Sequence, residues 1–260
     1  MATLQLNNKT IAYEHLPGSS PGILFCSGFR SDMNGNKARA LNEHCKNRDW
    51  ACTRFDYQGH GASGTDFTDC GIGDWIDDAV DVLDHQTSGP QIVIGSSMGL
   101  WMTLHMALQR PDRVAAIVGI AGAPDFTEEL IWNKLDAKTR DLLQNGGTWM
   151  RPSRYDDGEP YPISQLLIES GRSHLVTGST ININCPVRLL HGTADTDVPW
   201  DCSLKVIEQL TSTDATLTLI KDADHRLSAP AEIEMILSTI DRLHEQLTAG
   251  NSSKKGYVNS

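Results

Sequence analysis

The chain has 260 residues, of which 39% are hydrophobic and 21% are charged, and its formal net charge at pH 7 is −11. This length and composition favour one α/β domain with an inserted segment over two separate domains. The negative charge disfavours nucleic acids and anionic membranes as partners, because both would repel the chain. No apolar run approaches the roughly 20 residues of a membrane span, so stable membrane insertion is not expected.

The N-terminal residues contain neither an apolar signal core nor an arginine-rich leader, which predicts a non-secreted chain. The six cysteines are scattered without CxxC pairs or a Cys/His cluster. We therefore expect reduced thiols and no metal site. Cys26 and Cys52 fall in expected strands and should be buried.

Strands and helices are expected to alternate along most of the chain. The first two strands, at 3–6 and 10–13, are typical of a hairpin. Further strands are expected at 22–27, 51–55, 91–95, 114–120, 187–191 and 215–220, and helices at 37–48, 72–86, 97–109, 201–210 and 230–247. This alternation predicts an α/β fold with a mainly parallel eight-stranded sheet and helices on both faces. Ligands bind such sheets at the C-terminal ends of the strands.

The pentapeptide at 95–99, Gly-Ser-Ser-Met-Gly, follows an apolar strand and precedes an apolar helical stretch that ends before Pro111. A serine on a strained strand-to-helix turn needs residues without bulk two positions to either side. Gly95 and Gly99 meet this need and nominate Ser97 as a nucleophile. The alternative is a tight glycine turn with a capping serine.

A serine hydroxyl is a poor nucleophile, so this hypothesis requires an acid and a histidine base later in the chain. Asp195 lies just past a strand, where a loop can aim it inward, and is the better candidate for the acid. Asp197 is the alternative, although it also fits a cap for the helix starting near Asp201. His225 is the natural base, because it alone among the nine histidines follows the acid on a post-strand loop.

Three other histidines have simpler explanations. His60 precedes Ser97 in the chain and breaks the expected order of the triad. His191 closes a strand and is expected to pack in a turn. His244 lies in the middle of a helix and is expected to be exposed to solvent.

An oxyanion hole should complete the site, and here its donors are expected to be backbone N–H groups. One is that of Met98, directly after the candidate nucleophile. The other is that of Phe29, in the loop after the strand at 22–27, where Gly28 precedes it. The alternative for this loop is an ordinary glycine turn after a strand.

The segment at about 123–184 breaks the alternation and is expected to form a helical lid inserted into a domain that spans 1–247. Its larger apolar residues are Phe126, Leu130, Ile131, Trp132, Trp149, Met150, Tyr155, Tyr161, Leu166 and Leu167. We expect Trp132, Trp149 and Met150, with Trp200, to line a substrate pocket. The alternative is that these side chains pack the lid onto the body. The tail at 248–260 is expected to be disordered.

Short motifs spread over most of residues 22–245 carry a family resemblance. They are Met33-Asn34-Gly35-x-Lys37-Ala38, Arg54-Phe55-Asp56-Tyr57, Gly89-Pro90-Gln91-Ile92, Gly95-Ser96-Ser97, Asn184-Cys185-Pro186-Val187-Arg188-Leu189-Leu190-His191-Gly192, Val198-Pro199-Trp200 and Asp224-His225-Arg226. With the serine turn, acid, base and oxyanion loop, they make the chain resemble the α/β-hydrolase superfamily. Within it, the chain resembles the α/β-hydrolase domain-containing protein 10 group.

This resemblance implies palmitoyl-protein thioesterase and acyl-glucuronide esterase activities, with a Ser-Asp-His triad that falls on Ser97, Asp195 and His225. It implies a cytoplasmic location if the source is bacterial, and a mitochondrial one for an animal homologue whose leader has been removed. The sequence departs from the group after Gly99, where Leu100-Trp101 stands and a second glycine is common.

We therefore expect a serine hydrolase that cleaves esters or thioesters through an acyl-enzyme and needs no cofactor. Its substrate would be a small-molecule acyl ester or an S-acylated protein. One alternative is a general carboxylesterase for small metabolite or xenobiotic esters. Another is a fold that binds ligands without catalysis, since fold does not fix function.

Overall fold

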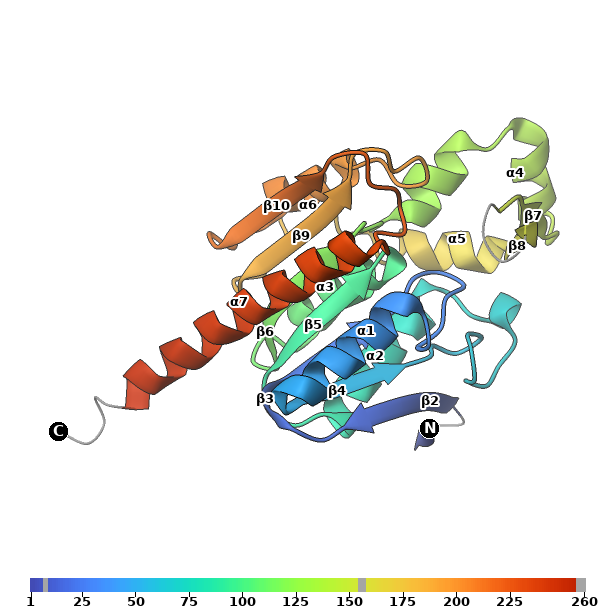
Figure 1. Ribbon diagram of the computed structural model, residues 1–260. Helices are drawn as coiled ribbons and strands as arrows, with labels where there is room; N and C mark the ends of the chain where they lie inside the picture. The colour runs from blue at the N-terminus through green and yellow to red at the C-terminus, as the bar shows by residue number, and fades with distance from the viewer. Residues whose placement is uncertain (7–8, 154–157, 256–260) are drawn as a thin grey trace.

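A computed structural model describes residues 1–6, 9–153 and 158–255. Its centre is an eight-stranded sheet in the order β1-β2-β4-β3-β5-β6-β9-β10 (Figure 1). The strands are β1 (Ala2–Leu6), β2 (Lys9–Leu16), β3 (Ser19–Cys26), β4 (Trp50–Phe55), β5 (Gln91–Ser96), β6 (Val114–Ile120), β9 (Val187–Gly192) and β10 (Ala215–Ile220). Only the pairs β1–β2 and β2–β4 in this sheet are antiparallel. The expected mainly parallel eight-stranded sheet is confirmed.

Helices cover both faces of the sheet. They are α1 (Asn36–Arg48), α2 (Ile72–Gln86), α3 (Met98–Gln109), α6 (Asp201–Gln209) and α7 (Pro230–Lys255), with a short 3₁₀ turn, η1 (Phe67–Asp69). Alternate side chains of β5 serve opposite faces, because the side-chain period of a strand is two. Ile92 and Ile94 belong to the core under α1 and α7, and Val93 belongs to the core under α2, α3 and α6. In Figure 1, α1 and α7 lie in front of the sheet.

The last helix differs from expectation at two points. It continues to Lys255 rather than ending at 247, and Thr248 donates its hydroxyl to the His244 carbonyl at 2.9 Å. The expectation that His244 is exposed is wrong, because its ring stacks on Trp50 with centroids 3.7 Å apart and only 6% of the residue is accessible. None of the helices in the described part of the chain is long and apolar enough to cross a membrane.

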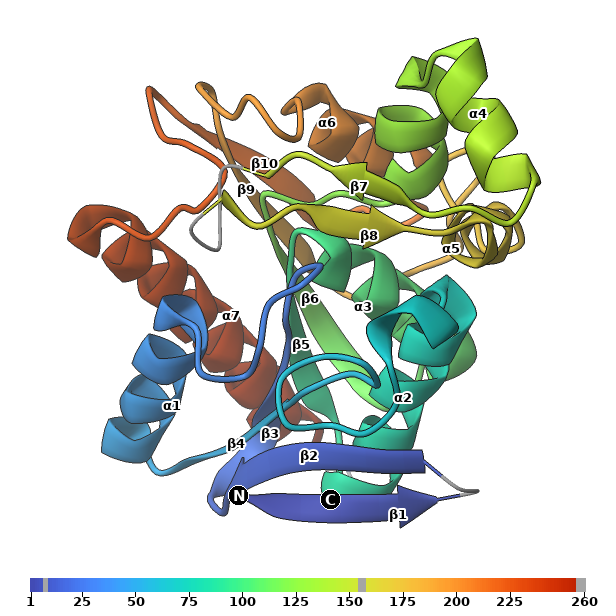
Figure 2. The same cartoon turned by 90° about the vertical axis from the view of Figure 1, so that its right-hand side faces the viewer.

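A mixed insertion joins β6 to β9. It contains η2 (Thr127–Ile131), η3 (Trp132–Lys134), α4 (Ala137–Gln144), β7 (Trp149–Arg151), β8 (Tyr161–Ile163) and α5 (Gln165–Arg172). β7 and β8 pair as an antiparallel hairpin that lies above the C-terminal ends of the central strands (Figure 2). This hairpin was not expected, since three-residue strands are too short to show an alternating pattern.

A buried carboxylate holds the end of this insertion to its beginning. Asp125, at 2% exposure, accepts the backbone N–H of Val176 at 2.9 Å through one oxygen and that of Thr177 at 2.8 Å through the other. The side chain of Thr177 also donates to it at 2.6 Å. Because a buried carboxylate without donors would be costly, these bonds fix both ends of the insertion next to the sheet.

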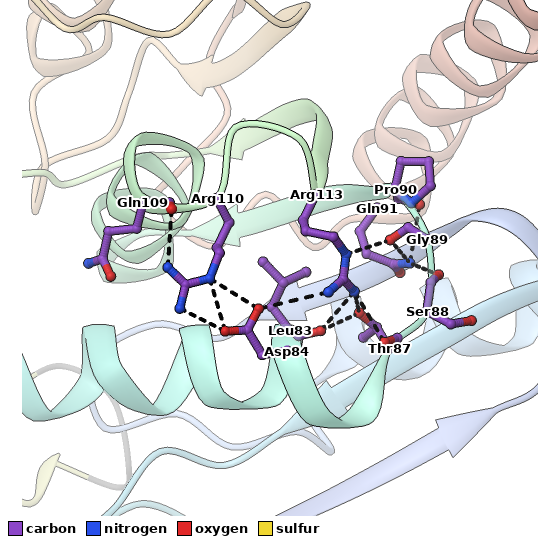
Figure 3. Close-up of polar contacts among 10 residues, drawn as sticks. All are labelled: Leu83, Asp84, Thr87, Ser88, Gly89, Pro90, Gln91, Gln109, Arg110 and Arg113. Atoms are coloured by element: carbon purple, nitrogen blue, oxygen red, sulfur yellow. Dashed lines mark hydrogen bonds and ion pairs between the residues drawn. The ribbon is translucent and has the colours of Figure 1, made fainter.

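Two arginines brace the opposite end of the sheet, where β5 begins (Figure 3). The Arg113 guanidinium donates to the carbonyls of Leu83, Thr87 and Gly89 at 2.9 to 3.1 Å. It thereby satisfies carbonyls at the C-terminus of α2 that have no partner within the helix. Arg110 binds Asp84 of the same helix, with Nε and Oδ2 2.9 Å apart. This network ties α2 to the loops that precede β5 and β6.

We expect Arg113→Gln to lower the free energy of unfolding by about 2 kcal/mol, because several carbonyls lose charge-assisted donors. Urea denaturation measures the change. Arg242→Gln is the matched control, since that exposed arginine donates only one long bond, to Thr239 at 3.4 Å, among the described residues, and it should change stability by less than about 0.5 kcal/mol. Equal effects of the two substitutions would contradict the assignment.

Candidate active site

Ser97 lies on a strained turn between β5 and α3. Its φ is +54°, a left-handed conformation that residues with a side chain seldom adopt. The turn is held by backbone bonds, since the Ser97 N–H donates to Ile120 at 2.9 Å and the Ala123 N–H donates to the Ser97 carbonyl at 3.0 Å. Such strain persists only where the surrounding structure enforces it, and here it presents the hydroxyl at the C-terminal edge of the sheet.

The two flanking glycines allow this turn because the backbone leaves no space for a side chain. A Cβ on Gly95 would lie 2.4 Å from the Gly99 carbonyl carbon, and a Cβ on Gly99 would lie 2.2 Å from the Cys26 carbonyl oxygen. Both distances are far below van der Waals contact, and backbone atoms cannot move aside as a flexible side chain can. Positions 95 and 99 therefore accept glycine and no larger residue without a shift of the backbone.

Three side chains from separate loops meet at this edge. His225, after β10, has its Nε2 3.1 Å from the Ser97 hydroxyl and its Nδ1 2.7 Å from Asp195 Oδ2. A carboxylate accepts hydrogen bonds but does not donate them, so Nδ1 carries the proton and Nε2 can accept the hydroxyl proton. The Asp195 side chain is fully buried, and that of His225 is 15% exposed.

The carboxylate of Asp195 is surrounded by donors. Its Oδ1 accepts the backbone N–H of Asp197 at 3.0 Å and of Val198 at 2.8 Å. Its Oδ2 also accepts the Nε2–H of His191 at 3.1 Å. Burial by itself would raise the pKa of Asp195, but the bonds from His191, His225 and Val198 together lower that pKa well below its ordinary value. Asp195 is therefore held as an anion.

His191 was not anticipated as part of this cluster. It is fully buried, and its Nδ1 accepts the hydroxyl of Ser203 on α6 at 2.7 Å while Nε2 faces Asp195. The alternative role for Asp197 as a cap is wrong, since α6 has Trp200 at its N-cap and no side-chain cap bond. Asp197 instead lines the cavity described below.

The two expected oxyanion donors flank Ser97. Met98 is the first residue of α3, and the Phe29 loop approaches so closely that a Cβ on Gly28 would lie 3.3 Å from the Cβ of Ser97. Phe29 and Met98 both line the cavity that contains Ser97. Within the described residues, neither backbone N–H donates a hydrogen bond to another group, so both can receive a substrate oxygen.

A cavity of about 630 Å³ opens in front of Ser97. Its apolar lining includes Phe29, Ala123, Phe126, Leu130 and Val198. Its charged lining comprises Arg30, Lys37, Arg151, Arg226, Asp32 and Asp197, with His225 beside Ser97. Among the described lining residues, cations therefore outnumber anions, although the whole chain has a charge of −11.

The pocket residues expected from the sequence do not line this cavity. Trp132 is partly buried against the core and lies under the guanidinium groups of Arg140 and Arg172, at 5.4 and 4.4 Å from the ring centroid. Trp149 also packs on the core. These two residues therefore pack the lid onto the body of the protein, which was the alternative expectation.

Met150 and Trp200 are absent from the cavity lining as well. They are 50% and 39% exposed to solvent. Of the larger apolar lid residues named from the sequence, Phe126, Leu130 and Tyr161 do reach the cavity among the described residues. Tyr155 lies outside the described residues.

Two basic residues of the cavity carried no role in the sequence analysis. Lys37 of α1 donates its ammonium to the Arg226 carbonyl at 2.5 Å, next to His225, and burial lowers its pKa to about 8. Arg151, at the end of β7, pairs through its backbone with Tyr161, while its guanidinium makes no hydrogen bond or ion pair with another described side chain. Burial lowers the pKa of Arg151, while the nearby Asp197 acts to raise it. Lys37 belongs to one of the motifs of the family resemblance, which was the available signal for it.

Within the described residues no group of three His, Cys, Asp or Glu side chains is arranged to hold a metal ion. All six cysteines are unpaired, and Cys26 and Cys52 are buried in β3 and β4 as expected.

Comparisons with known proteins agree with this fold. A family model described as alpha/beta hydrolase fold matches residues 21–150. The human protein named "Palmitoyl-protein thioesterase ABHD10, mitochondrial" is 40% identical over 238 residues, which are 92% of this chain and 78% of that protein.

Two solved structures are similar over nearly the whole chain. That of alpha/beta hydrolase domain-containing protein 10 from mouse has a TM-score of 0.88 at 39% identity, and covers 95% of this chain and 98% of its own. A putative hydrolase from Agrobacterium vitis S4 also has a TM-score of 0.88, at 36% identity, and covers 94% and 97%. The chain therefore belongs to the α/β-hydrolase family and, within it, to the α/β-hydrolase domain-containing protein 10 group, and it is a hydrolase of the esterase or thioesterase kind.

Proposed function

We propose that this protein is a serine hydrolase that cleaves acyl esters or thioesters through an acyl-enzyme intermediate. The observation that carries the proposal is the chain of contacts from Ser97 through His225 to Asp195, at 3.1 and 2.7 Å, at the wall of the cavity. A nucleophile, a base within hydrogen-bond reach and a group that orients the base are the parts this chemistry requires.

In the proposed mechanism, His225 takes the Ser97 proton as the hydroxyl oxygen attacks the substrate carbonyl carbon. The N–H groups of Phe29 and Met98 stabilise the negative charge that develops on the carbonyl oxygen. His225 then gives the proton to the leaving alcohol or thiol, and the acyl group stays on Ser97. Water, activated in the same way, releases the acid. Asp195 keeps the imidazole in the required tautomer and stabilises its protonated form.

For the substrate we propose acyl-protein thioesters and acyl glucuronides. The thioester is supported by the printed name of the 40% identical relatives, and the apolar part of the cavity at Phe126 and Leu130 suits an acyl chain. The acyl glucuronide is supported by the basic lining, because a sugar carboxylate pairs well with a guanidinium. A general carboxylesterase for small neutral esters is the second candidate.

The proposed cellular location also rests on similarity to named relatives. The five mammalian relatives are named as mitochondrial proteins. We propose a mitochondrial location if this chain comes from an animal and a cytoplasmic one if it comes from a bacterium.

Ser97→Ala tests the proposed function. Wild-type protein should hydrolyse p-nitrophenyl acetate and an S-palmitoyl peptide, and a fluorophosphonate probe should add one mass increment at Ser97 by intact-mass spectrometry. The variant should lose the label and at least about 10³-fold of kcat, because the acyl acceptor is gone. Wild-type protein that binds acyl ligands but shows neither hydrolysis nor labelling would favour the non-catalytic alternative.

Asp195→Asn separates the two candidate acids. The amide removes the charge that stabilises protonated His225 and disturbs its tautomer, so kcat should fall by roughly 10⁴-fold. Asp197→Asn should reduce kcat less than about tenfold, because Asp197 contacts the acid through its backbone N–H, which the substitution keeps. Steady-state kinetics of both variants on one ester decides the matter, and the reverse order would assign the acid to Asp197.

Arg151→Gln tests the anionic substrate class. The test uses two aryl butyrates that are identical except that the leaving group of one bears a carboxylate and that of the other bears a carboxamide. Wild-type kcat/KM should favour the carboxylate, and the variant should lose roughly tenfold on that substrate alone, since a charge-assisted bond is removed. Arg140→Gln is the control, because Arg140 contacts the Trp132 carbonyl and ring outside the cavity. Equal losses on both substrates would argue against an anion-binding role for Arg151.

A further inference from the structure

The loop that carries the proposed Phe29 donor has a strained backbone. Arg30, the next residue, has a φ of +59° although it is not glycine. Around Arg30 the loop closes on itself through the bond from the Ser31 N–H to the Gly28 carbonyl at 3.1 Å. A left-handed residue with a full side chain costs free energy and persists only when its neighbours enforce it. Something outside the loop must therefore hold Arg30.

His60 supplies that contact. The Arg30 backbone N–H donates to His60 Nε2 at 3.1 Å, and the other ring nitrogen, Nδ1, lies 3.1 Å from the Gln58 carbonyl. A carbonyl only accepts, so Nδ1 must carry the proton, which leaves Nε2 with the lone pair that Arg30 requires. Both contacts therefore demand the same neutral tautomer.

The surroundings of His60 keep it in that state and place. It is 4% exposed, and its ring packs edge to face on Tyr57, Phe67 and Trp75 at centroid distances of 5.0 to 5.6 Å. Burial lowers its pKa to about 4, and the nearby Arg30 charge acts in the same direction. The imidazole is therefore neutral at neutral pH.

The ring of Phe29 belongs to the same aromatic cluster. It contacts Phe67 at 5.1 Å and Trp75 at 5.9 Å, so His60 and Phe29 share two neighbours. The turn that presents His60 is tight, since Gly59 and Gly61 both have positive φ and a Cβ on Gly61 would lie 2.1 Å from Asp56 Oδ2. The position of the histidine is thus fixed by backbone as well as by packing.

A second buried contact holds the far end of the loop. Asp56 accepts the Met33 N–H at 2.6 Å and the Ala62 N–H at 2.8 Å, and Arg54 donates to the Met33 carbonyl at 2.6 Å. The loop after β4 therefore grips the Phe29 loop at two points, Arg30 and Met33. Of these, the Arg30 contact is the nearer to the proposed oxyanion donor.

We propose that His60 is a positioning residue for the oxyanion hole: as a neutral hydrogen-bond acceptor it fixes the Phe29–Arg30 peptide and thereby aims the Phe29 N–H at the substrate oxygen. This role rests on the proposed serine-hydrolase function. His60 is not among the described residues that line the cavity, so it would act through the loop. Misplacing one donor is costly to the rate, because oxyanion donors act on charge that develops only in the transition state.

The test compares His60→Leu, which removes the acceptor, with His60→Gln, whose amide oxygen can still accept the Arg30 N–H. On p-nitrophenyl acetate, His60→Leu should lower kcat by roughly tenfold to hundredfold, as expected for a misplaced donor, with KM changed by less than about threefold. His60→Gln should recover most of kcat. The exchange rate of the Arg30 amide hydrogen, measured by NMR, should rise in the leucine variant and stay near wild type in the glutamine variant.

His105→Leu is the matched control. This partly buried histidine bonds the His174 carbonyl at 2.8 Å, away from the cavity, so its loss should lower the melting temperature without changing kcat. A leucine variant of His60 that remains folded with unchanged kcat, or a glutamine variant no better than leucine, would overturn the positioning role. Wild-type protein without hydrolytic activity would instead overturn the proposed function, and the Arg30 amide exchange would still report on the contact.

Discussion

The close contact between the start of α3 and the ends of β3 and β5 is the constraint on which this structure depends. Gly95 and Gly99 bring backbone against backbone with no room for a Cβ, and this approach forces Ser97 into its left-handed conformation. The same approach aligns the N-terminus of α3 with the cavity. This one backbone contact thus sets the positions of both Ser97, the candidate nucleophile, and Met98, one candidate oxyanion donor.

The charged groups in and beside the cavity have two different roles: one carboxylate is buried next to His225, and several basic side chains line the cavity. The buried carboxylate of Asp195 accepts four hydrogen bonds from the described residues. Two come from the imidazoles of His191 and His225, and two come from the backbone N–H groups of Asp197 and Val198. Four basic side chains are among the described residues that line the cavity, in an otherwise acidic chain. The Asp195 cluster is suited to holding His225 in one protonation state, and the basic side chains are suited to binding an anionic group.

The sheet, and the residues that directly follow its strands, could be predicted from the sequence, because periodicity in long apolar segments is a strong signal. Ser97, Asp195 and His225 each come just after a strand, and parallel strands bring such positions to one edge. The contact of His191 with Asp195 depends on the path of one loop, which no pattern encodes. The exposure assigned to His244 was wrong because its neighbour Trp50 is distant in the chain.

The lid was the hardest part to predict from the sequence, because its structure also depends on contacts between residues that are distant in the chain. Its elements have at most eight residues among those described, so packing against the body rather than periodicity decides which face of each meets the cavity. Trp132 and Trp149 therefore pack on the core rather than in the expected pocket, and no pattern in the sequence indicates that Arg151 lines the cavity.

The strands β7 and β8 contribute Arg151 and Tyr161 to the cavity wall, but none of the residues Ser97, Asp195 and His225. These strands form a separate two-stranded sheet, and in the described part of the chain this sheet has no backbone pairing with the central one. Substitutions in this hairpin can therefore change the lining of the cavity without moving Ser97, Asp195 and His225. In evolutionary terms, the insertion is a part of the protein in which selectivity can diverge among relatives that keep one chemistry.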